Sequence, residues 1–229
     1  MPADRPEHGF ATRAIHAGQD ADPATGATVV PIYATSTYTQ EAPGKHKGYE
    51  YSRSGNPTRA ALETCLAAIE GGERALAFAS GLAATTAVLS TLRPRDEVVA
   101  AADLYGGTFR LLERVFKPWG LVPRYVEDAS PEGFAAAMTP ATKFVWIETP
   151  TNPLLQILDI AAIAEISHRH GATFAVDNTF ASPYLQRPIE HGADLVIHST
   201  TKYLGGHSDV IGGAVIGRRD LVEIGRAHV

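Results

Sequence analysis

The stretch "DLVIHSTTKYLGGHSD", residues 194–209, runs from an apolar segment into three hydroxyl residues and a lysine, Lys202. The apolar segment is typical of a buried β-strand. A lysine at the end of a buried strand is costly unless it is paired or used covalently. The hydroxyl groups are suited to binding an anion, and the double glycine at 205–206 suggests that another group approaches the backbone. We therefore weigh the hypothesis that Lys202 forms a Schiff base beside a phosphate.

Apolar strands alternate with helices through most of the chain. Strands are expected at 74–79, 97–101, 122–126, 143–148, 173–177, 194–198 and 212–217. The strands are nearly all apolar rather than alternating, which is typical of a parallel sheet covered by helices on both faces. The expected fold class is therefore α/β with a mostly parallel sheet.

The first 55 residues differ from the rest. They are rich in Gly, Pro, Thr and Tyr and show little helical periodicity, so we predict an irregular N-terminal arm over residues 1–55. Asn56 is a good N-cap for a following helix. A large domain is expected over residues 56–222.

Polar and glycine-rich residues follow five of the expected strands. Ligands bind at the carboxyl ends of the strands in such a sheet, so these residues are expected to line one site. They are residues 80–82, 103–107, 148–153, 177–179 and 199–202.

The turn at Ser80 and Gly81 leads from a strand into a helix, whose first N–H groups have no intrahelical partners and form an anion site. Taken alone, the turn is better explained as a helix N-cap. It is not a nucleotide-binding phosphate loop, because neither G-x-x-x-x-G-K-[ST] nor a G-x-G-x-x-G after a strand is present.

Asp177 and Tyr105 each allow two interpretations. Asp177 ends an apolar strand and either holds its own loop or binds a pyridinium N–H. Tyr105 precedes two glycines and either stacks on a flat ring or is an ordinary packing residue. Together with Lys202 and the helix-end anion site, they match pyridoxal 5′-phosphate, which needs a lysine, an acid for its ring nitrogen and a phosphate site.

Six stretches resemble one enzyme family, the pyridoxal-phosphate enzymes of cysteine and methionine metabolism in the cystathionine γ-synthase and γ-lyase group. They are "YEYSRSGNPTR", "LAFASGLAAT", "DLYGGT", "VWIETPTNP", "VDNTFASPYLQRP" and "HSTTKYLGGHSDVIGG", in order along the chain. The resemblance implies the large domain of a fold-type-I, aspartate-aminotransferase-like transferase. It also implies that the C-terminal small domain is absent, so that the chain is truncated.

The resemblance assigns a role to each candidate site residue. Lys202 would bind the cofactor covalently, Asp177 would pair with the pyridinium, and Tyr105 would stack on the ring and assist proton transfer. Asn152 would bind the ring hydroxyl. The remaining cofactor-binding residues would be Ser80, Gly81, Leu82, Thr179, Ser199 and Thr201, with Gly81 and Leu82 offering backbone N–H groups to the phosphate.

Tyr51 and Arg53 resemble the pair that reaches the phosphate of a neighbouring subunit. The resemblance therefore implies a homodimer, with dimers pairing into a homotetramer. Residues 223–229 do not resemble the helix expected at this point and are expected to be a non-native tail.

The implied reaction is loss or replacement of a group at the γ carbon of an amino acid. Cystathionine γ-synthase joins activated homoserine to cysteine, and cystathionine γ-lyase cleaves cystathionine; the sequence does not separate them. Methionine γ-lyase and O-acetylhomoserine sulfhydrylase are alternatives, as is a non-catalytic fragment. An aminotransferase is a weaker alternative.

Composition excludes other functions. The formal net charge of −5 gives no positive field for DNA or RNA. Cys65 is the single cysteine, so no intramolecular disulfide is expected. The histidines show no metal-ligand spacing, and no apolar run approaches a membrane span, so neither a metal nor a membrane is expected. The expected location is the cytoplasm.

Overall fold

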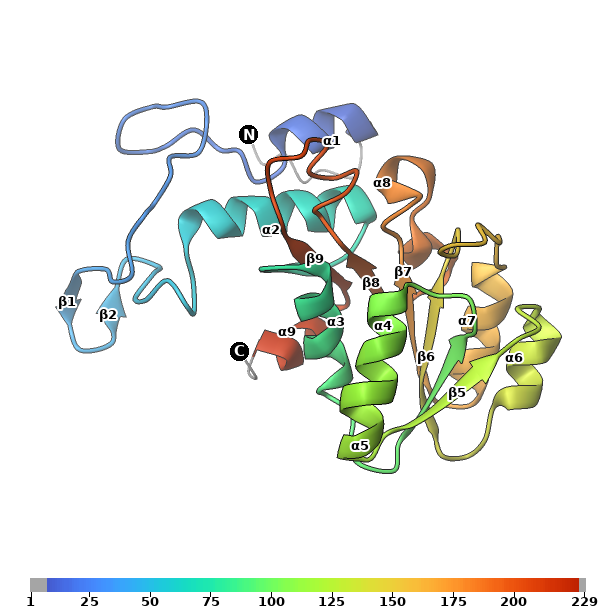
Figure 1. Ribbon diagram of the computed structural model, residues 1–229. Helices are drawn as coiled ribbons and strands as arrows, with labels where there is room; N and C mark the ends of the chain where they lie inside the picture. The colour runs from blue at the N-terminus through green and yellow to red at the C-terminus, as the bar shows by residue number, and fades with distance from the viewer. Residues whose placement is uncertain (1–7, 227–229) are drawn as a thin grey trace. The chain divides into compact units, whose positions relative to one another are not determined.

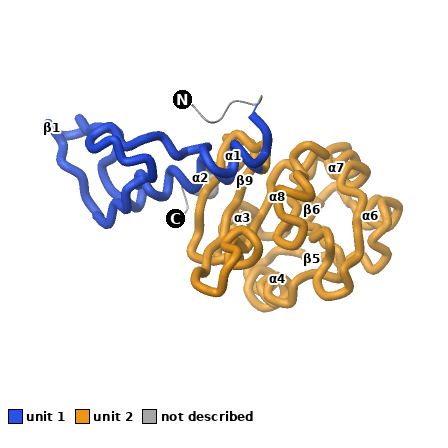
Figure 2. The backbone as a smooth tube through the Cα atoms, turned by 90° about the horizontal axis from the view of Figure 1, so that it is seen from above, with its two compact units in different colours: residues 1–69 blue, residues 70–229 orange. Residues whose placement is uncertain are grey.

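The computed structural model of the chain describes residues 8–226. The chain divides after Ile69 into two compact units, residues 1–69 and residues 70–229 (Figure 2). Helix α2 groups with the segment before it; the Arg13 side chain, for example, donates to the Ala68 carbonyl at 2.7 Å. The arm and large domain expected over 1–55 and 56–222 stay a prediction about domain organisation.

The first unit has more secondary structure than expected. It contains the helix α1 (Phe10–His16), the paired strands β1 (Gln40–Ala42) and β2 (Lys45–His46), and all but the last residue of α2 (Pro57–Glu70). The prediction of an entirely irregular arm is therefore wrong at α1 and at the hairpin. The predicted cap of α2 is confirmed, because Asn56 Oδ1 accepts the amide of Thr58 at 2.9 Å.

Seven strands of the second unit, which lie between residues 74 and 217, form one sheet (Figure 1). Its order is β3-β9-β8-β7-β6-β4-β5, and β8, β7, β6, β4 and β5 are parallel neighbours. The strand β9 pairs antiparallel with both β3 and β8, so it runs opposite to the other six strands. The predicted mostly parallel α/β sheet is thus confirmed. The strands are β3 (Arg74–Phe78), β4 (Glu97–Ala101), β5 (Val122–Val126), β6 (Thr142–Glu148), β7 (Thr173–Asp177), β8 (Leu195–His198) and β9 (Gly213–Gly217).

Helices cover both faces of this sheet, with α3 and α4 on one face and α6 and α7 on the other (Figure 1). The central strands are accordingly buried on both sides; every residue of β4 is buried, and Trp146 of β6 is 1% exposed. The helical segments are α3 (Gly81–Leu89), α4 (Gly106–Leu111), the π-helical η1 (Leu112–Phe116), α5 (Lys117–Trp119), α6 (Pro131–Ala137), α7 (Ile160–Arg169), α8 (Ser182–Leu185), the 3₁₀ turn η2 (Pro188–His191) and α9 (Arg219–Arg226).

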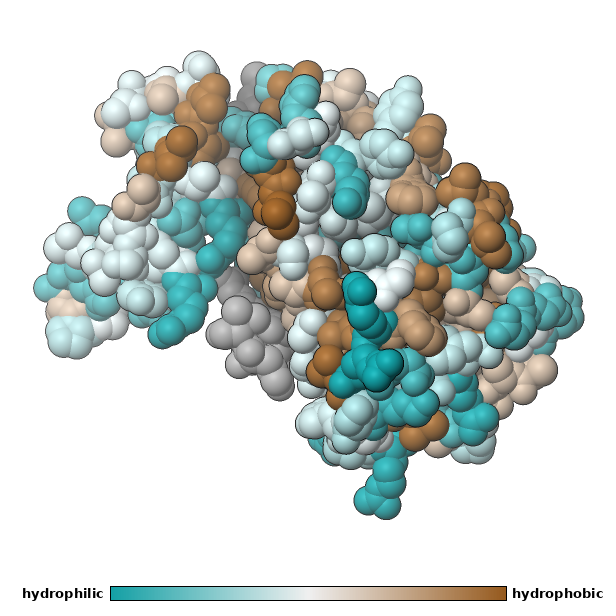
Figure 3. Space-filling view, viewed as in Figure 1, coloured by the Kyte–Doolittle hydropathy of each residue, from teal (hydrophilic) through white to brown (hydrophobic). Residues whose placement is uncertain are grey.

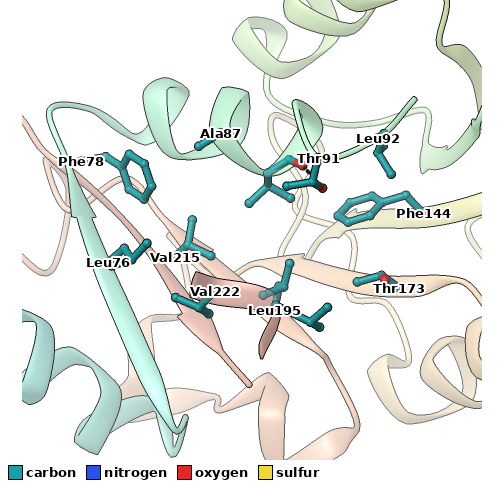
Figure 4. A pocket seen from close by; sticks show the side chains of 12 residues that line it. Leu76, Phe78, Ala87, Thr91, Leu92, Phe144, Thr173, Leu195, Val215 and Val222 are labelled. Carbon is teal, nitrogen blue, oxygen red and sulfur yellow. Dashed lines mark hydrogen bonds between the residues drawn. The ribbon is translucent and has the colours of Figure 1, made fainter. Parts of the chain in front are cut away.

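A small cavity of about 70 Å³ lies between α3, α9 and the sheet. Figure 4 shows Leu76, Leu195, Val215 and Val222 around it. The lining is almost wholly apolar, so the cavity is a gap in the hydrophobic core and offers no group for catalysis.

Helix α9 continues through Arg226, so residues 223–226 are part of the helix. The sequence-based expectation that the helix does not continue through them is wrong. Residues 227–229 lie outside the described part of the chain. The expectation that residues 223–229 are non-native stays a prediction.

Candidate active site

A cavity of about 500 Å³ opens at the carboxyl edge of the parallel strands. Its lining comes from the residues that follow β3, β4, β6, β7 and β8, where the sequence places the candidate site. Every candidate residue of the second unit lines it: Ser80, Gly81, Leu82, Tyr105, Asn152, Asp177, Thr179, Ser199, Thr201 and Lys202.

Helix α3 presents its N-terminus to this cavity. Ser80 is the N-cap, and its Oγ accepts the amide of Ala83 at 3.1 Å. A Cβ on Gly81 would lie 2.7 Å from the Cβ of Ser199, so glycine lets the first turn of α3 approach Ser199 closely. The amides of Gly81 and Leu82 precede the first intrahelical bonds and suit an anion.

Asp177 is held by the residue two positions after it. The Thr179 amide donates to Asp177 Oδ1 at 3.0 Å, and Thr179 Oγ1 accepts the Ser199 amide at 2.9 Å. Burial raises the pKa of Asp177, and the hydrogen bonds from Thr179 oppose that shift. A cationic ring nitrogen in the cavity would favour the ionised carboxylate, so the loop-holding and ring-binding interpretations are compatible.

Glu148 belongs to the range 148–153 that was expected to line the site, and it does line the cavity, but sequence reasoning assigned it no role. It ends β6 beside Asp177, its register partner on β7, and it is 4% exposed. Burial, followed by the charge of Asp177, raises the pKa of Glu148 to about 9. The carboxyl group is therefore protonated at neutral pH. The available sequence signal was its place at the end of an apolar strand next to Asp177.

Tyr105 stands at the start of α4 and is 49% exposed. Its amide donates to Glu148 Oε2 at 2.8 Å. A Cβ on Gly107 would lie 2.3 Å from Tyr105 Cε1, so the glycine makes room for the ring. Tyr105 lines the cavity and leaves about half of its surface exposed, so part of it is available for contact with a flat ligand.

Lys202 lies in a turn after β8 and is exposed, so it does not carry the burial cost that a lysine inside the strand would have. Its amide donates to the Ser199 carbonyl at 3.1 Å, and the Gly206 amide donates to its carbonyl at 2.9 Å. A Cβ on Gly205 would lie 2.7 Å from the Thr200 carbonyl oxygen, so this glycine serves the turn itself, not an approaching ligand.

Thr201 ties the same turn to the segment before β9. Its Oγ1 donates to the Gly212 carbonyl at 3.2 Å and accepts the Gly212 amide at 3.0 Å. Thr201 lines the cavity, but its hydroxyl is already engaged by backbone. Its role as a phosphate ligand stays a prediction.

Tyr51 and Arg53 belong to the first unit. The Arg53 guanidinium carbon lies 5.1 Å from the centre of the Tyr51 ring, within cation–π range, and both residues are exposed. Their contact with a phosphate of a neighbouring subunit stays a prediction.

Across residues 8–226, no group of three or more His, Cys, Asp or Glu side chains is placed to hold a metal ion. In the same part of the chain, no helix has the length and apolar character needed to cross a membrane.

Known proteins resemble the chain over nearly all of its length. A probable cystathionine gamma-synthase of Herpetosiphon aurantiacus is 57% identical over 214 residues, 93% of this chain and 67% of that protein. A cystathionine beta-lyase of Coxiella burnetii is 53% identical over 208 residues, 90% of this chain and 54% of that protein. β-Elimination is an activity that the sequence-based alternatives did not include.

The solved structures agree with these relatives. A crystal structure of cystathionine gamma-lyase from Lactobacillus plantarum complexed with L-serine matches with a TM-score of 0.92 and 47% identity. The match covers 96% of this chain and 59% of that one, so the chain spans about half to two thirds of the length of these proteins. The family model of the Cys/Met metabolism PLP-dependent enzymes matches residues 11–226. The chain therefore belongs to this family, whose cofactor is pyridoxal 5′-phosphate.

Proposed function

We propose that Lys202 binds pyridoxal 5′-phosphate covalently and that the protein acts at the γ carbon of an amino acid, as a cystathionine γ-synthase or γ-lyase. One observation carries the proposal. A single cavity gathers a lysine amine, a carboxylate at a strand end, an exposed tyrosine ring and the N-terminus of α3. The residues present fit the cofactor, because each of its reactive or charged parts has a complementary group.

The cofactor supplies an aldehyde that accepts an amino group and a ring that takes up electrons. Asp177 keeps the ring nitrogen protonated, Tyr105 lies against the ring, and Asn152 hydrogen-bonds the ring hydroxyl. The amides of Gly81 and Leu82 hold the phosphate with the hydroxyl groups of Ser199 and Thr201. Lys202 Nζ would also be the base that moves protons to and from the substrate Cα.

Exposed apolar side chains support the proposed homo-oligomer. Figure 3 shows hydrophobic surface on the second unit, and several large apolar residues there are at least 60% exposed. They lie in the segment after β6 and in α8: Leu154, Leu155, Ile157, Tyr184 and Leu185. In a homodimer or homotetramer these residues would be covered, and Tyr51 and Arg53 would reach the partner's phosphate.

The test of the cofactor assignment is reduction of the cofactor-loaded protein with borohydride, followed by mass spectrometry of its peptides. The label is expected on Lys202. A label on Lys45, Lys47, Lys117 or Lys143 instead would contradict the assignment. Absence of any label on folded protein would favour the alternative of a non-catalytic chain.

The test of the reaction is a product assay. Cystathionine cleaved at the γ carbon yields 2-oxobutanoate, ammonia and cysteine, whereas β-elimination yields pyruvate, ammonia and homocysteine. Activated homoserine with cysteine yields cystathionine if the protein is a γ-synthase. Pyruvate as the main product would overturn the γ-carbon assignment and favour the activity named for the Coxiella burnetii relative.

A further inference from the structure

Two loops at the cavity edge are joined by two carboxyl groups, and each carboxyl group accepts hydrogen bonds from the other side of the connection. The Tyr105 loop, residues 102–105, connects β4 to α4, and the Asn152 loop, residues 149–159, connects β6 to α7. Glu148, directly before the Asn152 loop, accepts the amide of Tyr105 at 2.8 Å. One end of the Tyr105 loop is thus bound to the strand that leads into the other loop.

The reverse connection comes from Asp103 in the Tyr105 loop. Its Oδ2 accepts the amide of Leu154 at 3.1 Å and also the hydroxyl group of Thr151. Both donors belong to the Asn152 loop and flank Asn152 itself. Hydrogen bonds to a carboxylate are stronger than those between neutral groups, so this connection is well suited to fix the loop.

We propose that Asp103 and Glu148 form a reciprocal clamp and act as positioning residues that hold Tyr105 and Asn152 in place for the cofactor ring. The clamp rests on the proposed function, in which the Tyr105 side chain contacts the ring and the Asn152 side chain its hydroxyl group. Neither clamp residue needs to touch the cofactor. Their effect is to remove the freedom of two loops before the ligand arrives, which lowers the entropy cost of binding.

The Asn152 loop is ordered around Thr151, the residue that Asp103 binds. Thr151 is fully buried, its amide donates to the Gln156 carbonyl at 3.0 Å, and its Oγ1 accepts the Gln156 amide at 2.9 Å. Leu155 adopts φ of 57°, a left-handed conformation that is unfavourable for a residue with a side chain. The surrounding hydrogen bonds hold the loop in this form.

Charge explains why Glu148 can accept a hydrogen bond so close to two other acids. Burial and the neighbouring charges of Asp177 and Asp103 all favour its protonated form. A neutral Glu148 still accepts the Tyr105 amide through one oxygen. A neutral Glu148 also adds no negative charge beside Asp177 and Asp103. Asp177 therefore remains the acid that is available to a cationic ring.

Hydrogen exchange in the cofactor-free protein tests the clamp directly. Asp103→Ala removes the acceptor of Leu154, and we expect the Leu154 amide to exchange about tenfold faster. Because the clamp is reciprocal, the Tyr105 amide should also exchange several-fold faster, although Asp103 does not touch it. Thr151→Val, at nearly constant shape, removes the hydroxyl group that donates to Asp103 and accepts the Gln156 amide, and it should act in the same direction.

Conservative and control variants separate positioning from general destabilisation. Glu148→Gln keeps a neutral acceptor and should leave both amides near their wild-type exchange rates, whereas Glu148→Ala should free Tyr105. Asp159→Ala is the matched control, because Asp159 accepts the Ala162 amide at 3.0 Å at the far end of the same connection. It should leave Tyr105 and Leu154 unchanged.

The second readout is the binding of pyridoxal 5′-phosphate, followed by its visible circular dichroism. Asp103→Ala and Thr151→Val should weaken binding about tenfold and reduce the dichroic signal, while Asp159→Ala should do neither. Faster exchange at Leu154 alone, with Tyr105 and cofactor binding unchanged, would overturn the clamp. If the wild-type chain fails to bind the cofactor, the proposed function fails, and the exchange experiment still decides whether the two loops are coupled.

Discussion

Glu148 and Asp177 are register partners on the parallel strands β6 and β7, so two carboxyl groups end side by side at the floor of one cavity. Burial raises the pKa of both groups, and that of Glu148 reaches about 9. Two neighbouring acids in a poorly solvated place do not both ionise at neutral pH. Glu148 is therefore the neutral member of the pair. Asp177 is the member whose ionised form a nearby cation would favour.

The first prediction concerns stability and pH. Between the ordinary pKa of Glu148, 4.5, and its folded value of about 9, the folded chain holds a proton that the unfolded chain has lost. Its contribution to stability is therefore present at low pH and falls as pH rises through this range, by at most about 1.4 kcal/mol per pH unit. Glu148→Gln should remove this dependence.

Urea unfolding of the two cofactor-free proteins checks this between about pH 6 and pH 8.5. The stability of Glu148→Gln relative to wild type should increase steadily with pH. Asp177 is present in both proteins, so the difference reports mainly on Glu148. Parallel stability curves would show that Glu148 is ionised in the folded chain.

The second prediction concerns Asp177→Asn. The amide can still accept the Thr179 N–H, so the loop after β7 should keep its form and the protein its fold. It cannot keep a ring nitrogen protonated, and loss of such a preorganised group lowers turnover roughly a hundredfold or more. Turnover is to be measured on protein with matched cofactor content. Near-normal turnover would leave Asp177 with only its loop-holding role.

The strands and the position of the site were predictable because they depend on local pattern. Residues 97–101 and 173–177 are apolar runs bounded by polar residues, and both are strands with those limits. Since parallel strands present their carboxyl ends together, reading the residue after each strand was enough to collect the cavity lining.

Helix α1 and the contacts of Lys202 were not predictable in this way. Helix α1 has seven residues and buries none of them, so there is no apolar stripe for periodicity to detect. Lys202 follows a buried strand, but the turn begins at Ser199 and carries the lysine out to solvent. Sequence showed the end of the strand and not the direction of the chain beyond it.

Long-range polar pairs were also beyond the sequence. Glu70 at the end of α2 is fully buried and accepts the Asn178 side-chain amide at 2.8 Å, a contact 108 residues away along the chain. The same Glu70 oxygen is hydrogen-bonded to His198. A glutamate at a helix end resembles a surface residue until tertiary packing brings the ends of β7 and β8 to it.

The third prediction concerns Gly81→Ala. A Cβ at Gly81 would lie 2.7 Å from that of Ser199, so α3 or the turn after β8 must shift, at a cost of about 1–3 kcal/mol. Because this contact lies at the proposed phosphate site, affinity for the cofactor should fall more than stability. Gly106→Ala is the matched control, since a Cβ there meets nothing within 4 Å. Equal effects of the two variants on cofactor binding would contradict the close approach at Gly81.

The last prediction concerns the oligomer, and it tests the proposed role of Arg53 in a partner's site. Arg53→Ala and Lys202→Ala subunits should each be poorly active alone, because one loses the phosphate contact and the other loses the covalent anchor. In a mixed dimer, one of the two sites would receive Lys202 from one subunit and Arg53 from the other. Co-expression of differently tagged subunits, followed by two-step affinity purification, isolates that species. Its turnover should approach half that of the wild-type dimer. A mixed dimer as inactive as its parents, with assembly confirmed by mass, would show that Arg53 acts within its own subunit or not at all.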